Sequence, residues 1–320
     1  MTSDFIWMDG ELVPFEKATV HFMNPSLHYG GAVFEGIRCY STADGPAIFR
    51  AREHAQRLLD SALIFGMREL PWTVDGLTQA FKDVVRANKF DECYVRPLIY
   101  LASGVLSLNI DDSKPTLGIA AWPWANYLGP EAMEKGIRAN ISSFTRHHPN
   151  VMMSKAKISG NYANSFLAKA ESLRMGFQEA IMLDPQGYVA ECTGENLFIV
   201  RGGRIYTSHT AAILEGITRD SLIAIARDLG YEVVEQPISR DQLYIADEVF
   251  VCGSAAEVAA LSEIDFRTIG SGKMGPVTRQ VQQAYHAAIH GRHPLSADWL
   301  DYVYGPAQPA RETASAQAAG

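Results

Sequence analysis

Cysteine is scarce in this chain of 320 residues, and the four cysteines lie far apart. Cys39, Cys93, Cys192 and Cys252 form no Cys-x-x-Cys pair, which argues against a disulfide framework or a zinc site and favours a reducing cytoplasm. Long apolar runs are also lacking, because the longest have the length of a strand and are too short to span a bilayer. Residues 1–5 lack the basic head and apolar core that begin a signal peptide.

Positive charge is in short supply as well. Lys and Arg number 28 against 36 Asp and Glu, which gives a net charge of −8, and no long basic block occurs. This balance argues against binding to nucleic acid or to a membrane surface. No acidic ligand accompanies His286, His290 and His293, so we expect no metal site there.

Length and apolar periodicity predict a two-domain α/β protein. Residues 125–136 include several turn-forming residues and are the expected linker. The predicted division is a small α/β domain at residues 1–124, this linker, a large domain at residues 137–305 and a disordered tail at residues 306–320.

The same pattern predicts the individual helices and strands. Helices are expected at residues 52–65, 74–88, 159–174, 218–229 and 277–289, and strands at residues 32–40, 94–101, 117–124, 137–144 and 248–252. Hairpins are expected at residues 5–15, 180–191 and 197–207. Thr73 and Thr218 are expected to cap helix N-termini, whereas Gly66, Gly176 and Gly230 are expected to end helices.

Three short runs combine an amine, a carboxylate and a helix start. They are residues 155–162, with Lys155 and Lys157, residues 191–198, and residues 216–220. A lysine amine can form a Schiff base, a carboxylate can keep a pyridine nitrogen protonated, and a helix start can bind a phosphate. These are the groups that pyridoxal 5′-phosphate (PLP) requires, so the sequence predicts a PLP site.

Spacing alone leaves two choices open within this site. Lys155 and Lys157 point the same way if their segment is extended, and lysines usually lie on the surface. Glu191 and Glu195 likewise compete at the end of a predicted strand.

A tyrosine and an arginine share one face of a predicted strand. Tyr94 and Arg96 are two residues apart, so their side chains project to the same side. An unpaired buried arginine is costly, which favours a binding role for this pair over a structural one.

Together with residues 28–30 and 34–38, these runs resemble the fold-type IV PLP enzymes, and most closely the branched-chain amino acid aminotransferases, over roughly residues 5–304. The resemblance implies a large domain with a β-barrel-like core, with PLP in the cleft between the domains. It implies that Lys157 is the Schiff-base lysine, Glu191 the carboxylate on the ring nitrogen and Tyr162 the donor to the ring oxygen. The cofactor-binding residues that it implies are Arg57, Lys157, Tyr162, Glu191, Gly216, Ile217, Thr218 and Ser254. The substrate-binding residues that it implies are Tyr29, Phe34, Gly36, Arg38, Tyr94, Arg96, Trp124, Tyr127, Ser254, Ala255, Leu106 and Leu108.

The resemblance also implies an activity and an assembly. The expected reaction is transamination of leucine, isoleucine or valine with 2-oxoglutarate, in which Arg96 binds the second carboxylate of glutamate. Leu106 and Leu108 would reach the site of a neighbouring subunit in a homodimer or a hexamer. Alternatives are a transaminase of D-amino acids or R-amines, a lyase of the aminodeoxychorismate type, and a protein that binds PLP or phosphate without catalysis.

Three positions depart from the pattern of these relatives. Ile158-Ser159 replaces smaller residues after the lysine, Cys192-Thr193 replaces a small pair after the glutamate, and Ser254 stands where threonine is common. The serine keeps a hydroxyl for the phosphate. The Cys192 step is expected to alter packing at the site and so the range of substrates.

Overall fold

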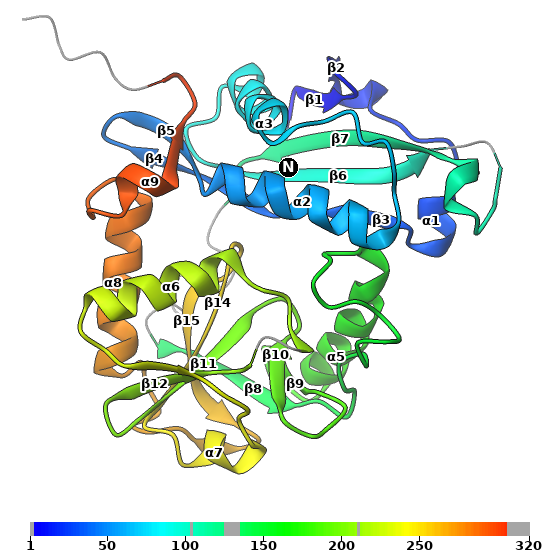
Figure 1. The fold of residues 1–320 in the computed structure, drawn as a ribbon. Coiled ribbons are helices and arrows are strands. Elements are labelled where there is room, and N and C mark those ends of the chain that lie inside the picture. The colour runs from blue at the N-terminus through cyan, green and yellow to red at the C-terminus, as the bar shows by residue number, and fades with distance from the viewer. Residues whose placement is uncertain (1–2, 103–104, 125–134, 210–211, 306–320) are drawn as a thin grey trace, which may run out of the picture.

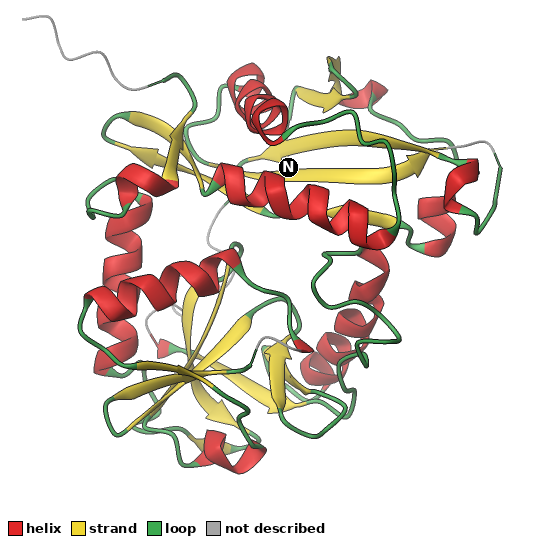
Figure 2. Cartoon of the chain, in the orientation of Figure 1, coloured by secondary structure: helices red, strands yellow, loops and turns green. Residues whose placement is uncertain are grey.

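Two sheets with helices packed on them make up the protein. The structure, a computed structural model, describes residues 3–102, 105–124, 135–209 and 212–305. Both halves mix helices and strands, which confirms the predicted α/β class (Figure 2). Within the described ranges, no helix is long and apolar enough to cross a membrane.

The first sheet contains eight strands among the described residues and lies in the upper half of Figure 1. In spatial order its strands are β17 (Leu300–Tyr302), β5 (Gly45–Phe49), β4 (Ile37–Thr42), β6 (Cys93–Ala102), β7 (Lys114–Trp122), β1 (Phe5–Met8) and β2 (Glu11–Pro14), and β3 (Ala32–Phe34) also pairs with β6. The helices and turns of this half are η1 (Phe15–Lys17), α1 (Pro25–Tyr29), α2 (Ala51–Phe65), α3 (Val74–Asn88) and η2 (Ile110–Asp112).

The second sheet contains nine strands in the described part of the chain, and Figure 1 shows it curved below the first. In spatial order its strands are β10 (Val189–Cys192), β9 (Glu179–Leu183), β8 (Ile137–Ile141), β15 (Glu257–Ile264), β14 (Glu248–Gly253), β11 (Asn196–Arg201), β12 (Arg204–Thr207) and β13 (Val233–Glu235), and β16 (Arg267–Thr268) pairs with β15. Its helices are η3 (Ser159–Asn161), α5 (Tyr162–Arg174), α6 (Ile217–Asp228), α7 (Arg240–Tyr244), α8 (Pro276–Ile289) and α9 (Ser296–Trp299).

The apolar periodicity of the sequence corresponds to the buried face of helix α2. Ala51, Ala55, Leu58 and Ala62 fall on one face and are at most 1% exposed, packed against the first sheet. The helix ends at Gly66, whose φ of +100° favours glycine. The predicted helix at residues 52–65 is therefore confirmed, with one more residue at its start.

The predicted strand at residues 32–40 is wrong in one respect, because it is interrupted. Strands β3 and β4 both pair with β6, but Glu35 and Gly36 lie between them. Pro97 of β6 lies opposite Glu35 and accepts a hydrogen bond from its N–H, but it has no N–H to return. The break leaves the Glu35 carboxylate free to turn toward α2.

The predicted N-cap of the helix at residues 218–229 is also wrong. Gly216 is the N-cap of α6, no side chain caps it within the described structure, and Thr218 lies inside the first turn. A Cβ atom at residue 216 would lie 1.9 Å from Asn196 Oδ1, so only glycine fits beside that amide. The helix therefore begins earlier than the threonine suggests.

The predicted domain division is only partly visible in the sheets. Residues 125–134 of the expected linker and residues 306–320 of the expected tail lie outside the described residues. Strand β17 falls within the predicted large domain, but its hydrogen bonds join it to β5 of the first sheet. The chain thus crosses back to the first half near its C-terminus.

Candidate active site

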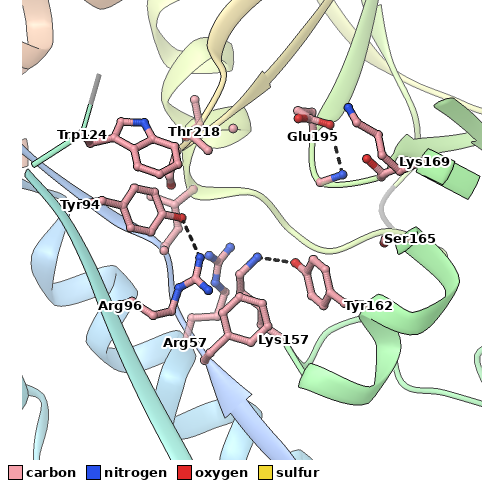
Figure 3. A pocket seen from close by; sticks show the side chains of 18 of the residues that line it. Arg57, Tyr94, Arg96, Trp124, Lys157, Tyr162, Ser165, Lys169, Glu195 and Thr218 are labelled. Carbon is pink, nitrogen blue, oxygen red and sulfur yellow. Dashed lines mark hydrogen bonds between the residues drawn. The ribbon is translucent and has the colours of Figure 1, made fainter. Parts of the chain in front are cut away.

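A cavity of about 330 Å³ lies between the two sheets, and Figure 3 shows its side chains from close by. Residues of the first sheet form one wall, and α5, the start of α6 and the loops of the second sheet form the other. Its lining consists of Phe34, Gly36, Arg57, Tyr94, Arg96, Trp124, Lys157, Tyr162, Ser165, Phe166, Lys169, Thr193, Gly194, Glu195, Ile217, Thr218, Gly253, Ser254 and Ala255.

The structure separates the two candidate lysines. Lys157 lines the cavity, and its Nζ donates a 2.6 Å hydrogen bond to Tyr162 Oη. Lys155 forms an ion pair of 3.0 Å with Glu215, and its side chain is 39% exposed. Of the two, Lys157 is therefore the one that presents its amine to the cavity.

The backbone around Lys157 is fixed by contacts with the first half of the chain, one of which requires glycine at residue 30. Its carbonyl accepts a 3.0 Å hydrogen bond from Phe34 N, and Ile158 forms a β-bridge with Val33. Gly160 N donates to Gly30 O, and a Cβ at residue 30 would lie 2.9 Å from the Gly160 Cα. Gly30 thus lets the lysine segment lie directly against the first half of the chain.

The two candidate glutamates differ in their neighbours. Glu191 is 8% exposed and accepts contacts from Arg146 at 3.1 Å and from Asn196 Nδ2 at 3.2 Å. Burial raises the pKa of the Glu191 carboxyl, although Arg146 and Lys157 oppose the shift. Glu191 borders a smaller pocket of about 40 Å³ that also touches Lys157 and Tyr162.

Glu195 instead lines the main cavity. Burial and the nearby Glu179 carboxylate raise its pKa to about 8, although Lys169 opposes the shift. Thr193 donates its hydroxyl to Glu179, which also pairs with Lys169. The hydroxyl at the Cys192-Thr193 step is therefore used to hold a buried carboxylate next to the cavity.

A second buried carboxylate organises the first-sheet wall. Glu35 is fully buried and accepts hydrogen bonds of 2.6 and 2.8 Å from Arg57 and contacts His54 at 2.7 Å. Burial raises the pKa of Glu35, but the charges of Arg57 and His54 outweigh it and hold the pKa well below its usual range. Arg57 also donates to the Glu215 carbonyl, just before the α6 N-cap.

Tyr94 and Arg96 both line the cavity, which confirms that they share a face of the strand. Arg96 Nη2 lies 3.3 Å from Tyr94 Oη, and its guanidinium stacks 4.7 Å from the centre of the Phe34 ring. Its buried Nε has no hydrogen-bond partner in the described structure. Gly36 makes room for this pair, because a Cβ there would lie 1.9 Å from Tyr94 Oη.

The other candidate residues divide into those at the cavity and those away from it. Of the implied binding residues, the cavity lining includes Phe34, Gly36, Trp124, Ile217, Thr218, Ser254 and Ala255. Tyr29 and Leu108 are exposed, Leu106 is half-buried, and none of the three lines the cavity. Gly216 precedes the lining residues of α6, and Tyr127 lies outside the described residues.

The family resemblance implies that Arg38 binds the substrate, but its side chain is not part of the cavity lining. Its guanidinium is 4% exposed and pairs with Glu92 and Glu257. The alternation of a strand predicts which side of the sheet Arg38 faces. It does not predict that a glutamate of the second sheet, Glu257, binds the side chain.

Sequence reasoning also missed four charged residues around the site. One signal existed for Glu35, because His54 and Arg57 lie three residues apart on the buried face of a helix and require an acid. No comparable signal marks the others. The missed residues are Glu35, Arg146, Lys169 and Glu179.

Comparison with known proteins agrees with this arrangement. The profile of the family described as "Amino-transferase class IV" matches residues 32–264. The chain belongs to the class IV aminotransferases. Among curated relatives, the branched-chain-amino-acid aminotransferase of Pseudomonas aeruginosa is 46% identical over 298 residues, which are 93% of this chain and 97% of that protein.

Solved structures of the same family are also similar. The T.th. branched-chain amino acid aminotransferase with pyridoxamine 5′-phosphate has a TM-score of 0.91 and 49% identity, and the match covers 95% of this chain and 99% of that one. Its complex with 4-methylvaleric acid has a TM-score of 0.90 and 48% identity, with the same coverage. The resemblance read from the motifs is thus confirmed at the level of family and fold.

The cavity of this class IV aminotransferase has groups that fit PLP, the cofactor of the family. An amine and a phenol lie 2.6 Å apart at its centre, in Lys157 and Tyr162. A helix start without a side-chain cap lies beside the Arg57 guanidinium, which suits a phosphate. Among the described residues, no group of three or more His, Cys, Asp or Glu side chains could hold a metal ion.

We predict that Glu195 makes stability depend on pH. The folded carboxyl titrates near 8 and the unfolded one near 4.5, so the folded state binds an extra proton between these values. The resulting stability is present in full below pH 4.5 and is lost as the pH rises toward 8. Glu195→Gln has no charge to bury, so its free energy of unfolding relative to wild type should rise across this window, by at most about 1.4 kcal/mol per pH unit.

Urea unfolding at several pH values between 5 and 8.5 would measure this difference, with about half-unit steps. Glu171→Gln is the control, because hydrogen bonds from Ser143 lower the pKa of Glu171 and its own contribution changes only under more acidic conditions. A Glu195→Gln curve parallel to wild type would contradict the prediction.

Proposed function

We propose that this chain transaminates the branched-chain L-amino acids with 2-oxoglutarate and uses PLP as its cofactor. The observation that carries the proposal is the Lys157 amine, which lies 2.6 Å from the Tyr162 hydroxyl inside a cavity lined by aromatic rings and guanidinium groups. Such a cavity suits an apolar side chain in one half of the reaction and a second carboxylate in the other.

Each proposed cofactor contact has a group of the right chemistry. Lys157 holds the cofactor covalently, Tyr162 donates to its ring oxygen, and Glu191 stabilises the protonated ring nitrogen. The start of α6, Arg57 and Ser254 bind the phosphate. When bound, PLP supplies an electron sink for the negative charge that develops at the substrate Cα.

Among the protein groups, Lys157 moves the proton. With PLP bound, the Lys157 amine would remove the proton from the substrate Cα as a general base and, as a general acid, would deliver it to C4′ of the cofactor. Arg146 faces Glu191 at 3.1 Å and favours its charged form, against the effect of burial. That charge is needed if Glu191 is to hold a proton on the ring nitrogen.

The pocket chemistry supports the range of substrates. Phe34, Trp124 and the methyl of Ala255 offer apolar surface to leucine, isoleucine and valine. Selection by one methylene is worth only about 1–3 kcal/mol, so the three substrates should overlap. 4-Methylvaleric acid is L-leucine without its amino group, and we expect it to bind in the same place without reacting.

A homodimer follows from the same proposal. Val20, Phe22, Leu27, Tyr29 and Leu108 are large apolar side chains that are 51–81% exposed. They lie on α1, on the segment before it and on the loop between β6 and β7, which Figure 1 shows at one end of the molecule. A second copy would cover them and bring Leu106 and Leu108 to its partner's site, which the molar mass in solution would test.

The first test is a visible absorbance scan of the purified protein. We expect a yellow band that L-leucine removes and 2-oxoglutarate restores. Lys157→Ala should lose the band and lower turnover by about 10⁴-fold or more, because it removes both the attachment point and the general base. Lys155→Ala is the matched control, since that lysine pairs with Glu215 outside the cavity, and it should keep both.

The outcomes of this scan are distinguishable. A band that responds only to D-alanine or to an R-amine would retain the cofactor and overturn the substrate assignment. Consumption of a substrate without any 2-oxo acid acceptor would indicate a lyase. No band after addition of PLP would contradict the proposal as a whole.

A second prediction concerns the carboxylate of the acceptor. Arg96→Met should raise the KM for 2-oxoglutarate by about 10- to 100-fold, because a hydrogen bond to a charged group is worth about 1.5–3 kcal/mol. L-Leucine has no side-chain carboxylate and is the internal control, so its KM should change much less. Equal effects on the KM values of both substrates in steady-state assays would contradict the role of Arg96.

A further inference from the structure

Arg38 joins the two sheets beside the cavity. It lies on β4 directly opposite Tyr94 of β6, so its side chain shares the cavity-facing side of the first sheet. Its Nη2 contacts Glu92 of the same half, and its Nη1 lies 3.2 Å from Oε1 of Glu257, which begins β15 of the second sheet. The guanidinium is 4% exposed and stacks 4.7 Å from the Tyr40 ring centre, so little water screens it.

Glu257 occupies an unusual backbone conformation. Its φ is +54°, in the left-handed region where a residue with a Cβ is strained. It pairs with Gly253 across the tight turn of residues 254–256 that connects β14 to β15. Glycine or asparagine is the usual choice for such a conformation. Glu257 is one of seven non-glycine residues with a positive φ among the described residues, and its ion pair with Arg38 is a contact that opposes the strain.

The turn held by this residue is part of the cavity wall. Gly253, Ser254 and Ala255 line the cavity, and Ala256 is buried behind them. The turn approaches the neighbouring loop closely, because a Cβ at residue 253 would lie 3.2 Å from the Gly194 carbonyl. A small displacement of the turn would therefore change the shape of the space that is offered to a substrate.

We propose that the Arg38–Glu257 ion pair sets the position of the turn at residues 254–256, which makes Arg38 and Glu257 positioning residues for substrate binding. The first sheet thereby fixes a wall of the cavity that belongs to the second sheet. The Glu257 carboxylate anchors the turn by binding Arg38, and a second contact with Glu92 holds the Arg38 guanidinium in place. This inference rests on the proposed function, in which Ala255 contacts the substrate and Ser254 binds the cofactor phosphate beside it.

The test uses variants of the full-length holoenzyme. Arg38→Met and Glu257→Ala should each raise the KM for L-leucine about tenfold and change kcat by less than about threefold, because binding geometry is lost but the reacting groups remain. The dissociation constant of 4-methylvaleric acid, read from tryptophan fluorescence because Trp124 lines the cavity, should rise in parallel.

Three further variants separate positioning from stability. Glu257→Gly also removes the carboxylate but relieves the strain at φ +54°, so its melting temperature should exceed that of Glu257→Ala while its KM stays raised. Arg38→Lys keeps the charge but reaches one carboxylate, so its KM should fall between wild type and Arg38→Met. The double variant Arg38→Met/Glu257→Ala should raise KM no more than either single change.

An ion pair elsewhere on β15 is the matched control. Arg138 binds Glu263 at 2.6 and 2.8 Å near the other end of that strand, away from the cavity. Arg138→Met should lower the melting temperature and leave the KM for L-leucine unchanged.

The result that would overturn the inference is a wild-type KM in Arg38→Met or in Glu257→Gly, or additive effects in the double variant. If Arg38→Met does not fold, Glu257→Gly carries the test alone. Wild-type protein that fails to turn over L-leucine would instead contradict the proposed function, so the two failures can be told apart.

Discussion

The buried carboxylate of Glu35 is the charge on which the cavity depends. It lies at the break between two strands of the first sheet and is fully buried. Arg57 and His54 of α2 supply its partners, and Arg57 continues to the Glu215 carbonyl beside the start of α6. Removing one partner of such a buried pair typically costs about 3–5 kcal/mol, because the other charge is left uncompensated. Through these contacts the Glu35 carboxylate connects the first sheet, α2 and the segment before α6.

Charged contacts continue along the same boundary between the halves. Arg50, at the start of α2, donates to Asp220 and Ser221 at 3.0 Å, one turn into α6. Together with Arg57, it holds α6 on both sides of its first turn. Apolar packing alone is non-directional and would permit sliding, whereas these hydrogen bonds fix the helix start relative to the lysine. A site proposed to bind a phosphate and two carboxylates would gain from cations placed at this boundary.

Local pattern predicted α2 and α3 well, because each buries one face and ends at a residue with a positive φ, which is Gly66 or Lys89. It could not choose between Lys155 and Lys157, since the choice depends on Glu215, which is about 60 residues away in sequence and binds Lys155. The same limit explains Arg38, whose partner is on the other sheet. Thr218 was a poor guide for a different reason, because the cap belongs to Gly216. The family resemblance supplied Lys157, Glu191 and Arg57, but neither it nor the pattern supplied the charged residues that surround them, namely Glu35, Arg146, Lys169 and Glu179.

Three glutamates near β10, Glu179, Glu191 and Glu195, have different charged neighbours and therefore different electrostatic environments. Glu191 faces Arg146 and Glu179 pairs with Lys169, whereas burial beside the Glu179 carboxylate raises the pKa of Glu195 to about 8. Thr193 contacts only Glu179 of the three, because its hydroxyl and its backbone N–H both donate to Oε1 of that carboxylate among the described contacts. A residue without a hydroxyl at position 193 would remove one hydrogen bond from the Glu179 carboxylate. Lys169 pairs with the same carboxylate and compensates its negative charge. The threonine at 193 and the lysine at 169 therefore hold the same buried carboxylate, and both of them line the cavity.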